Sequence, residues 1–199
     1  MLTLLALMAQ TATLDADPYV AARTCAVATR KANAGDLATV EEHARYMFYV
    51  MHAARARPEG QRIIKRVGTV MSAPLPEVQD GEVDGLIAQC DKRFPRLDRA
   101  TAANLPAEPI DRDIMCLTAL GVLHGGAEAV RETQPDDPWL DRLRAPEMQL
   151  MSRLNKKVLE RAGLAEDAAL TEAYDRQIRA SLDLGDALAV GRACGLRDD

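Results

Sequence analysis

The sequence has few aromatic residues, which make up 4% of its 199 positions, and it lacks the patterns that predict β-strands. Runs in which Val, Ile, Thr and aromatic residues alternate with polar ones are absent, so strands have no obvious place to form. No apolar run approaches the roughly 20 residues that a membrane-spanning helix needs. We therefore expect an all-α protein with no transmembrane helix in the mature chain.

Motifs that specify a reaction are also missing. The sequence contains no G-x-S-x-G elbow, P-loop, G-x-G-x-x-G or H-E-x-x-H. Its three histidines, His43, His52 and His124, stand outside any diagnostic motif, and Gly125-Gly126 after His124 indicates a close helix contact. We expect no cofactor and no catalytic residue. A binding protein is favoured over an enzyme with carboxylate or thiol chemistry in a cleft between two halves, or a purely structural envelope component.

Positive charge is not in excess, because 30 acidic residues outnumber 25 basic ones and the formal net charge is −5. Without a global positive field, non-specific binding to nucleic acid is disfavoured. The composition, 48% hydrophobic and 28% charged, is typical of a globular protein. The length suffices for one domain or for two of roughly 80 to 90 residues.

The only membrane-like segment is the uncharged apolar start, Met1–Ala9, which resembles a short secretory signal. No Lys or Arg precedes its apolar part, while the early acids Asp15 and Asp17 favour translocation. Residues 1–16 are therefore expected to be a signal peptide and a short mature leader, and the protein to be periplasmic or secreted. The alternatives are a docked first helix or a misassigned start in a cytoplasmic protein.

Four cysteines, none of them in a C-x-x-C motif, indicate disulfides in an exported chain. Three pairings are compatible with the sequence. We favour Cys25–Cys90 and Cys116–Cys194, because each pair then closes one half of the chain. Four buried free thiols in a cytoplasmic protein are the alternative.

Residues 17–95 are expected to form a first unit of four helices. Asp17 and Pro18 predict an N-cap and a first-turn proline, and Asp36 is expected to cap a longer, methionine-rich second helix. The fourth helix carries the second cysteine and stops at Pro95. A third helix from about 59 to 72 is expected to point five apolar residues inward: Ile63, Ile64, Val67, Val70 and Met71.

After a connector over 96–109, residues 110–199 are expected to repeat this plan. A long helix, a loop and a short extra helix precede Pro146, which is expected to open a helix through Met148 and Met151. Two more helices follow, and cysteines again lie on the first and the last. The sequence thus predicts two tandem, internally duplicated four-helix units, each closed by one disulfide.

The chain resembles small uncharacterised exported helical proteins of Gram-negative bacteria. In those proteins two cysteines flank a second helix of Tyr-Phe type and a basic stretch that ends in proline. The resemblance is carried here by Cys25, Tyr46-Met47-Phe48, the stretch from Arg55 to Pro58, and Cys90. It is nearly lost in the second half, and it implies an exported helical fold but no activity.

One helical face is a candidate metal site. His43, Met47 and Met51 stand at i, i+4 and i+8, so that an imidazole and two thioethers share a face. Thioether ligands suit Cu(I) in an envelope compartment. Methionine at helical spacing is more often core filler, so we expect no metal and keep these residues as the weaker alternative.

The segment around Tyr46, Phe48 and Tyr49 is apolar all round. Such a helix lies either at the centre of a bundle or in an interface, which here would be a homodimer contact, a protein-partner surface or a ligand groove.

A basic stretch follows this segment, and only one acid interrupts it. Basic side chains near a helix start can hold an anion or an anionic lipid headgroup, although most such runs are simply solvated. The candidate anion-binding residues are Arg55, Arg57, Arg62, Lys65 and Arg66.

Overall fold

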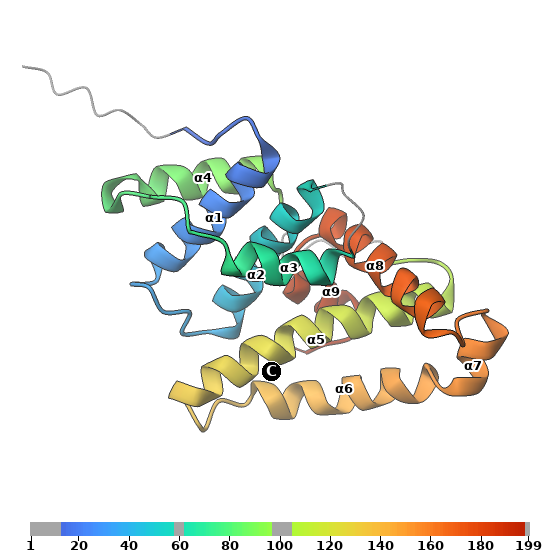
Figure 1. The fold of residues 1–199 in the computed structure, drawn as a ribbon. Helices are drawn as coiled ribbons and strands as arrows, with labels where there is room; N and C mark the ends of the chain where they lie inside the picture. The colour runs from blue at the N-terminus through green and yellow to red at the C-terminus, as the bar shows by residue number, and fades with distance from the viewer. Residues whose placement is uncertain (1–12, 58–61, 97–104, 198–199) are drawn as a thin grey trace, which may run out of the picture.

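The computed structural model describes residues 13–57, 62–96 and 105–197, and over these ranges every regular element is helical (Figure 1). The first half contains α1 (Pro18–Ala32), α2 (Val40–Ala56), α3 (Ile63–Ser72), the short 3-10 helix η1 (Asp80–Glu82) and α4 (Val83–Arg93). The second half contains α5 (Pro109–Thr133), α6 (Trp139–Arg153), α7 (Lys156–Arg161), α8 (Asp167–Leu184) and α9 (Ala187–Ala193). The all-α prediction is confirmed for the described residues.

Capping residues account for the starts of the first two helices. Asp17 caps α1 as predicted, and its carboxylate accepts a hydrogen bond from the Tyr19 backbone N–H at 2.7 Å. Helix α2 is capped by Thr39 and not, as expected, by Asp36. Thr39 is the cap because it forms a capping box with Glu42, in which each side chain accepts a hydrogen bond from the other residue's backbone N–H.

Two predicted helices have different bounds or faces. The expected start of the third helix lies outside the described residues, and α3 begins at Ile63. Ile63 and Val70 are buried as expected, whereas Ile64 and Met71 are 63% and 50% exposed. The expectation that all five apolar residues point inward is therefore wrong, because a helix covered on one side by α2 and α8 can bury only part of an apolar set spread over a wide arc.

Pro146 does not open a helix, since it lies inside a continuous α6. Trp139, Leu143 and Leu150 are buried on both sides of the proline, where α6 packs along α5 (Figure 1). Packing at both ends of α6 offsets the hydrogen bond that a mid-helix proline removes. The side chains of Met148 and Met151 on the same helix are exposed.

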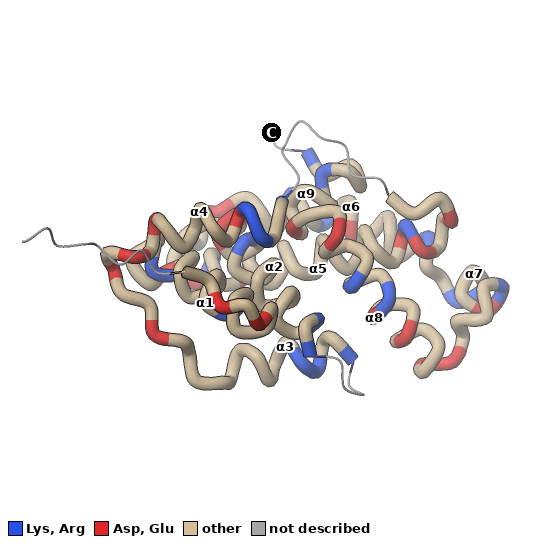
Figure 2. Tube along the Cα trace, turned by 90° about the horizontal axis from the view of Figure 1, so that it is seen from above, with Lys and Arg blue, Asp and Glu red and all other residues tan. Residues whose placement is uncertain are grey.

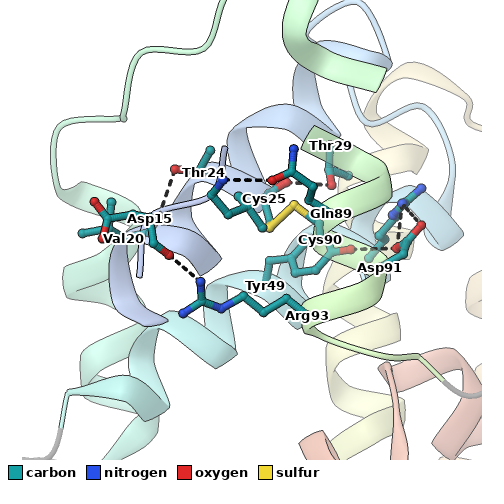
Figure 3. Close-up of a disulfide and its surroundings, with 12 residues drawn as sticks. Asp15, Val20, Thr24, Cys25, Thr29, Tyr49, Gln89, Cys90, Asp91 and Arg93 are labelled. Atoms are coloured by element: carbon teal, nitrogen blue, oxygen red, sulfur yellow. Dashed lines mark hydrogen bonds and ion pairs between the residues drawn. A yellow bond between two sulfur atoms is a disulfide. The ribbon is translucent and has the colours of Figure 1, made fainter. Parts of the chain in front are cut away.

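Both predicted disulfides are present. Cys25–Cys90 joins α1 to α4, and Cys116–Cys194 joins α5 to the residue after α9, each with a Cα–Cα distance of 5.7 Å. Figure 3 shows the first of them, with Arg93 of α4 reaching the backbone of Asp15 in the segment before α1. The disulfide and these polar contacts together hold the start of the described chain against α4.

The two halves are not separate in packing. The core around Cys25 includes Ile178 and Leu182 of α8, while the core around Cys116 includes residues of α2, among them Val40. Helices α2 and α8 therefore each contribute to both cores. The structure does not show an internal duplication, and the boundary at 96–109 stays a prediction.

Within the described residues, α5 is the one helix long and apolar enough, by length and composition, to cross a membrane. Half of its most apolar window is buried within the fold. The central helix of a soluble protein passes the same test, so the expectation about transmembrane helices stays untested.

Candidate functional site

An apolar groove of about 800 Å³ lies between α2, α3, α5 and α8. Each helix contributes one or more large apolar side chains to it. The apolar lining comprises Tyr46, Met47 and Met51 of α2, Ile63, Ile64, Val67 and Met71 of α3, Val122 and Ala129 of α5, Tyr174 and Ile178 of α8, and Leu37 of the loop before α2. We call this hollow the groove.

Glycines of α5 form the floor of the groove. A Cβ atom built on Gly121 or Gly125 would meet no atom within 4 Å, so these two positions leave space that a side chain would fill. Gly126 differs, because a Cβ there would lie 2.9 Å from the Cβ of His43. Gly126 thus permits the close contact of α2 with α5, as the Gly125-Gly126 pair indicated, while Gly121 and Gly125 keep the groove open.

The face predicted from His43, Met47 and Met51 exists, and all three residues line the groove. Burial lowers the pKa of His43, although a hydrogen bond to the Leu37 backbone and the nearby Glu42 carboxylate oppose the change. The imidazole is therefore neutral at pH 7. Across the described residues no three His, Cys, Asp or Glu side chains cluster as a metal site. Thioether ligands are not among these residue types, so a Cu(I) site of His43, Met47 and Met51 stays the weaker alternative.

The candidate interface residues separate from one another. Phe48 and Tyr49 are fully buried, and the Tyr49 hydroxyl donates to Asp91 Oδ1 at 3.0 Å (Figure 3). These two residues therefore form the centre of the bundle and cannot contact a partner. Tyr46 alone of the three lines the groove.

The basic stretch does not converge on an anion site. Arg55 pairs with Asp183 of α8, and the Arg57 guanidinium lies 4.0 Å from the centre of the Tyr19 ring. Arg66 is buried in the fold, whereas Arg62 and Lys65 are exposed at the start of α3. Helices α2 and α3 thus present these side chains to different neighbours, and anion binding by any of them stays a prediction.

Charges of both signs are mixed elsewhere on the surface. Figure 2 shows acidic and basic residues interspersed along α8. A smaller hollow of about 550 Å³ beside α8 is lined by such residues. Two ion pairs lie within this lining, Arg55 with Asp183 and Arg179 with Asp175, the latter at 2.7 Å. This hollow offers no unpaired set of charges for a ligand.

The two ends of the groove differ. At one end the last turn of α1 contributes Arg30 and the loop between α1 and α2 contributes Asp36, both exposed. At the other end Ile63 and Ile178 belong to the buried core. The groove therefore has an open polar mouth and a closed apolar end.

Sequence reasoning identified the α2 wall of the groove and missed its floor and its mouth. A signal for the floor is present, since Gly121, Gly125 and Ala129 recur every four residues and share one helix face. Arg30 carries no such signal, because only the turn between α1 and α2 brings it to the mouth. That turn contains Gly35 with a φ of 90°, in the left-handed region that favours glycine.

No protein-family model, curated protein or solved structure matches this chain. The resemblance to exported proteins of Gram-negative bacteria therefore stays a prediction. Function has to be inferred from the groove itself.

Proposed function

We propose that the protein is an exported, non-catalytic binding protein of the cell envelope, and that it holds a small apolar molecule in the groove. The observation that carries this proposal is the groove's size and lining. A volume of about 800 Å³ falls within the roughly 300–1,000 Å³ of small-molecule sites, which are mostly apolar with few polar groups. Removing apolar surface of the ligand and the wall from water supplies the affinity.

A small molecule fits better than a protein partner. Interface anchors are most often Trp, Tyr or Arg residues in a central position. The aromatic residues that could have served, Phe48 and Tyr49, are buried inside the bundle. Tyr46 and Tyr174 are left as two partly buried tyrosines that line a concave surface.

The groove also favours binding over catalysis. His43 is the one histidine on its described wall, and the neighbouring groups that perturb its pKa are the Leu37 backbone and the Glu42 carboxylate. The hydroxyl of Thr118, also on the wall, donates to the Ile114 carbonyl at 2.8 Å and not to a base. A nucleophile paired with a general base is thus missing from the described lining.

The envelope location has two supports. Disulfides persist in oxidising compartments, and the structure contains two. The apolar start of the sequence has the length of a secretory signal's apolar part. Both agree with a periplasmic or secreted protein.

The test is titration with N-phenyl-1-naphthylamine, an uncharged dye that fluoresces in apolar sites. Wild-type protein is expected to bind it, and Gly121→Leu is expected to weaken binding at least tenfold by filling the floor. Gly85→Leu is the matched control, because Gly85 is also helical and open but lies on α4 outside the groove. Absence of binding to wild type, or equal binding to all three proteins, would contradict the proposal.

A further inference from the structure

The lining residues give the groove a direction. Gly126 of α5 lies against His43 near the start of α2, so the later turns of α5 are at the mouth, beside Arg30. The backbone N–H of Ile63 donates to the Asp175 carboxylate of α8, which fixes the start of α3 beside α8 at the closed end. A ligand that enters with its apolar part first would leave its polar part at Arg30.

The floor sets the length of that apolar part. Its lining runs along α5 from Thr118 to Ala129, and at about 1.5 Å per residue this spans roughly 16 Å. Carbon–carbon bonds of about 1.5 Å advance an extended alkyl chain by about 1.3 Å per atom, so roughly a dozen carbons fit. Bare glycines along the floor suit a narrow linear chain lying directly on the helix.

The charge at the mouth indicates the polar part. Arg30 is the one Lys or Arg on the described lining, and its guanidinium makes only long hydrogen bonds, 3.3 and 3.4 Å, to the Gly35 carbonyl. It forms no ion pair with any described residue. A guanidinium in this state is free to form a bidentate pair with a carboxylate.

We infer that the groove binds a single-chain amphiphile, with its alkyl chain along the glycine floor of α5 and a terminal carboxylate at Arg30. This inference rests on the proposed function and names its ligand class. The anionic group is thus expected at Arg30 in the mouth of the groove, and not at the basic stretch of α2 and α3. Asp36 is exposed at the same mouth, and its negative charge repels a carboxylate. It therefore reduces the preference of the groove for an acid over an uncharged ligand.

The experiment displaces N-phenyl-1-naphthylamine with octanoate, decanoate, dodecanoate, hexadecanoate and 1-dodecanol, each below its micelle concentration. Affinity is expected to rise about fourfold per methylene up to about twelve carbons and then to level off. Dodecanoate is expected to bind at least tenfold more tightly than 1-dodecanol. An affinity that rises undiminished to sixteen carbons would overturn the proposed chain length.

Three variants test the carboxylate contact. Arg30→Gln is expected to abolish the preference for the acid over 1-dodecanol, and Asp36→Asn to strengthen binding of the acid. Arg144→Gln, on α6 outside the groove, removes one positive charge and should leave the preference intact. Equal binding of acid and alcohol to wild type, or a preference that survives in Arg30→Gln, would overturn the inference while the proposed function stood. Failure of the dye and every chain to bind would instead defeat the proposed function.

Discussion

A buried histidine makes the stability of this protein sensitive to mild acid. His52 lies between two aromatic rings, with centroid distances of 4.4 Å to Phe48 and 4.8 Å to Phe94. Its Nε2 is buried without a hydrogen-bond partner, and its Nδ1 lies 3.3 Å from the Arg55 guanidinium. Because Arg55 can only donate, the ring is neutral, with the proton on Nε2.

Burial lowers the pKa of His52 to about 4, and the positive charge of Arg55 acts in the same direction, while Asp183 opposes both. In the unfolded chain the pKa of His52 is about 6.5. Between this pH and about 4, the unfolded state therefore binds a proton that the folded state does not bind. The free energy of unfolding therefore falls as the pH drops from about 6.5 to about 4. At about 1.4 kcal/mol per pKa unit, the loss amounts to roughly 3 kcal/mol.

Urea unfolding at several pH values between 7 and 4 measures this loss, with His52→Leu as the comparison. Leucine has no proton to bind, so the variant should lose about 3 kcal/mol less than wild type over the interval. Some loss should remain, because burial also lowers the pKa of His43. Parallel pH profiles for the two proteins would refute the reasoning, as would an NMR titration in which the folded His52 ring titrates near pH 6.5.

Three further predictions concern stability and can be checked by urea unfolding at pH 7. Replacing both Cys25 and Cys90 by Ala should lower the free energy of unfolding by about 4 kcal/mol, because a loop with a sequence separation of 65 is no longer closed. Gly125→Ala should raise it by up to about 1 kcal/mol through helix propensity, whereas Gly126→Ala should lower it, because the new Cβ meets His43. Thr39→Ala should cost about 1 kcal/mol by removing the cap of α2.

Each of these has an internal control. Asp36→Ala should leave stability nearly unchanged, since Asp36 does not cap α2, and an equal loss in both variants would contradict the assignment of the cap to Thr39. For the glycines, the opposite signs of two neighbouring alanine substitutions are the critical result. For the disulfide, reduction of wild type should cost at least as much stability as the double variant loses, because reduction also opens Cys116–Cys194.

Local signals predicted the features whose cause is local. The Asp17-Pro18 start of α1 depends on residues adjacent in sequence, and it was predicted correctly. The cap of α2 was not, because two acceptors three residues apart compete there. The capping box between Thr39 and Glu42 decides the competition, and the pattern S/T-x-x-E was available in the sequence to identify it.

Burial was harder to predict, because it depends on which neighbours cover a helix. The apolar periodicity of α3 predicted that Ile64 and Met71 point inward. In the structure both are exposed at the edge of the groove. Phe48 and Tyr49 show the reverse case. The sequence left them between a core and an interface, and the packing of α1 on α2, together with the Phe94 ring after α4, buries them. Periodicity identifies an apolar face but does not say what lies against it.

The groove exists because one apolar helix face is not fully covered by its neighbours, and this is evident only in the assembled fold. Helix α5 places glycines where a core helix would place large side chains, and α2, α3 and α8 surround that surface without filling it. A stripe of small residues alone predicts equally well a close helix contact, which Gly126 makes, and an empty floor, which Gly121 and Gly125 leave. Two glycines adjacent in sequence thus have different roles. Gly126 lets α2 pack closely on α5, and Gly125 leaves space in the groove. That difference becomes visible only once the helices are placed.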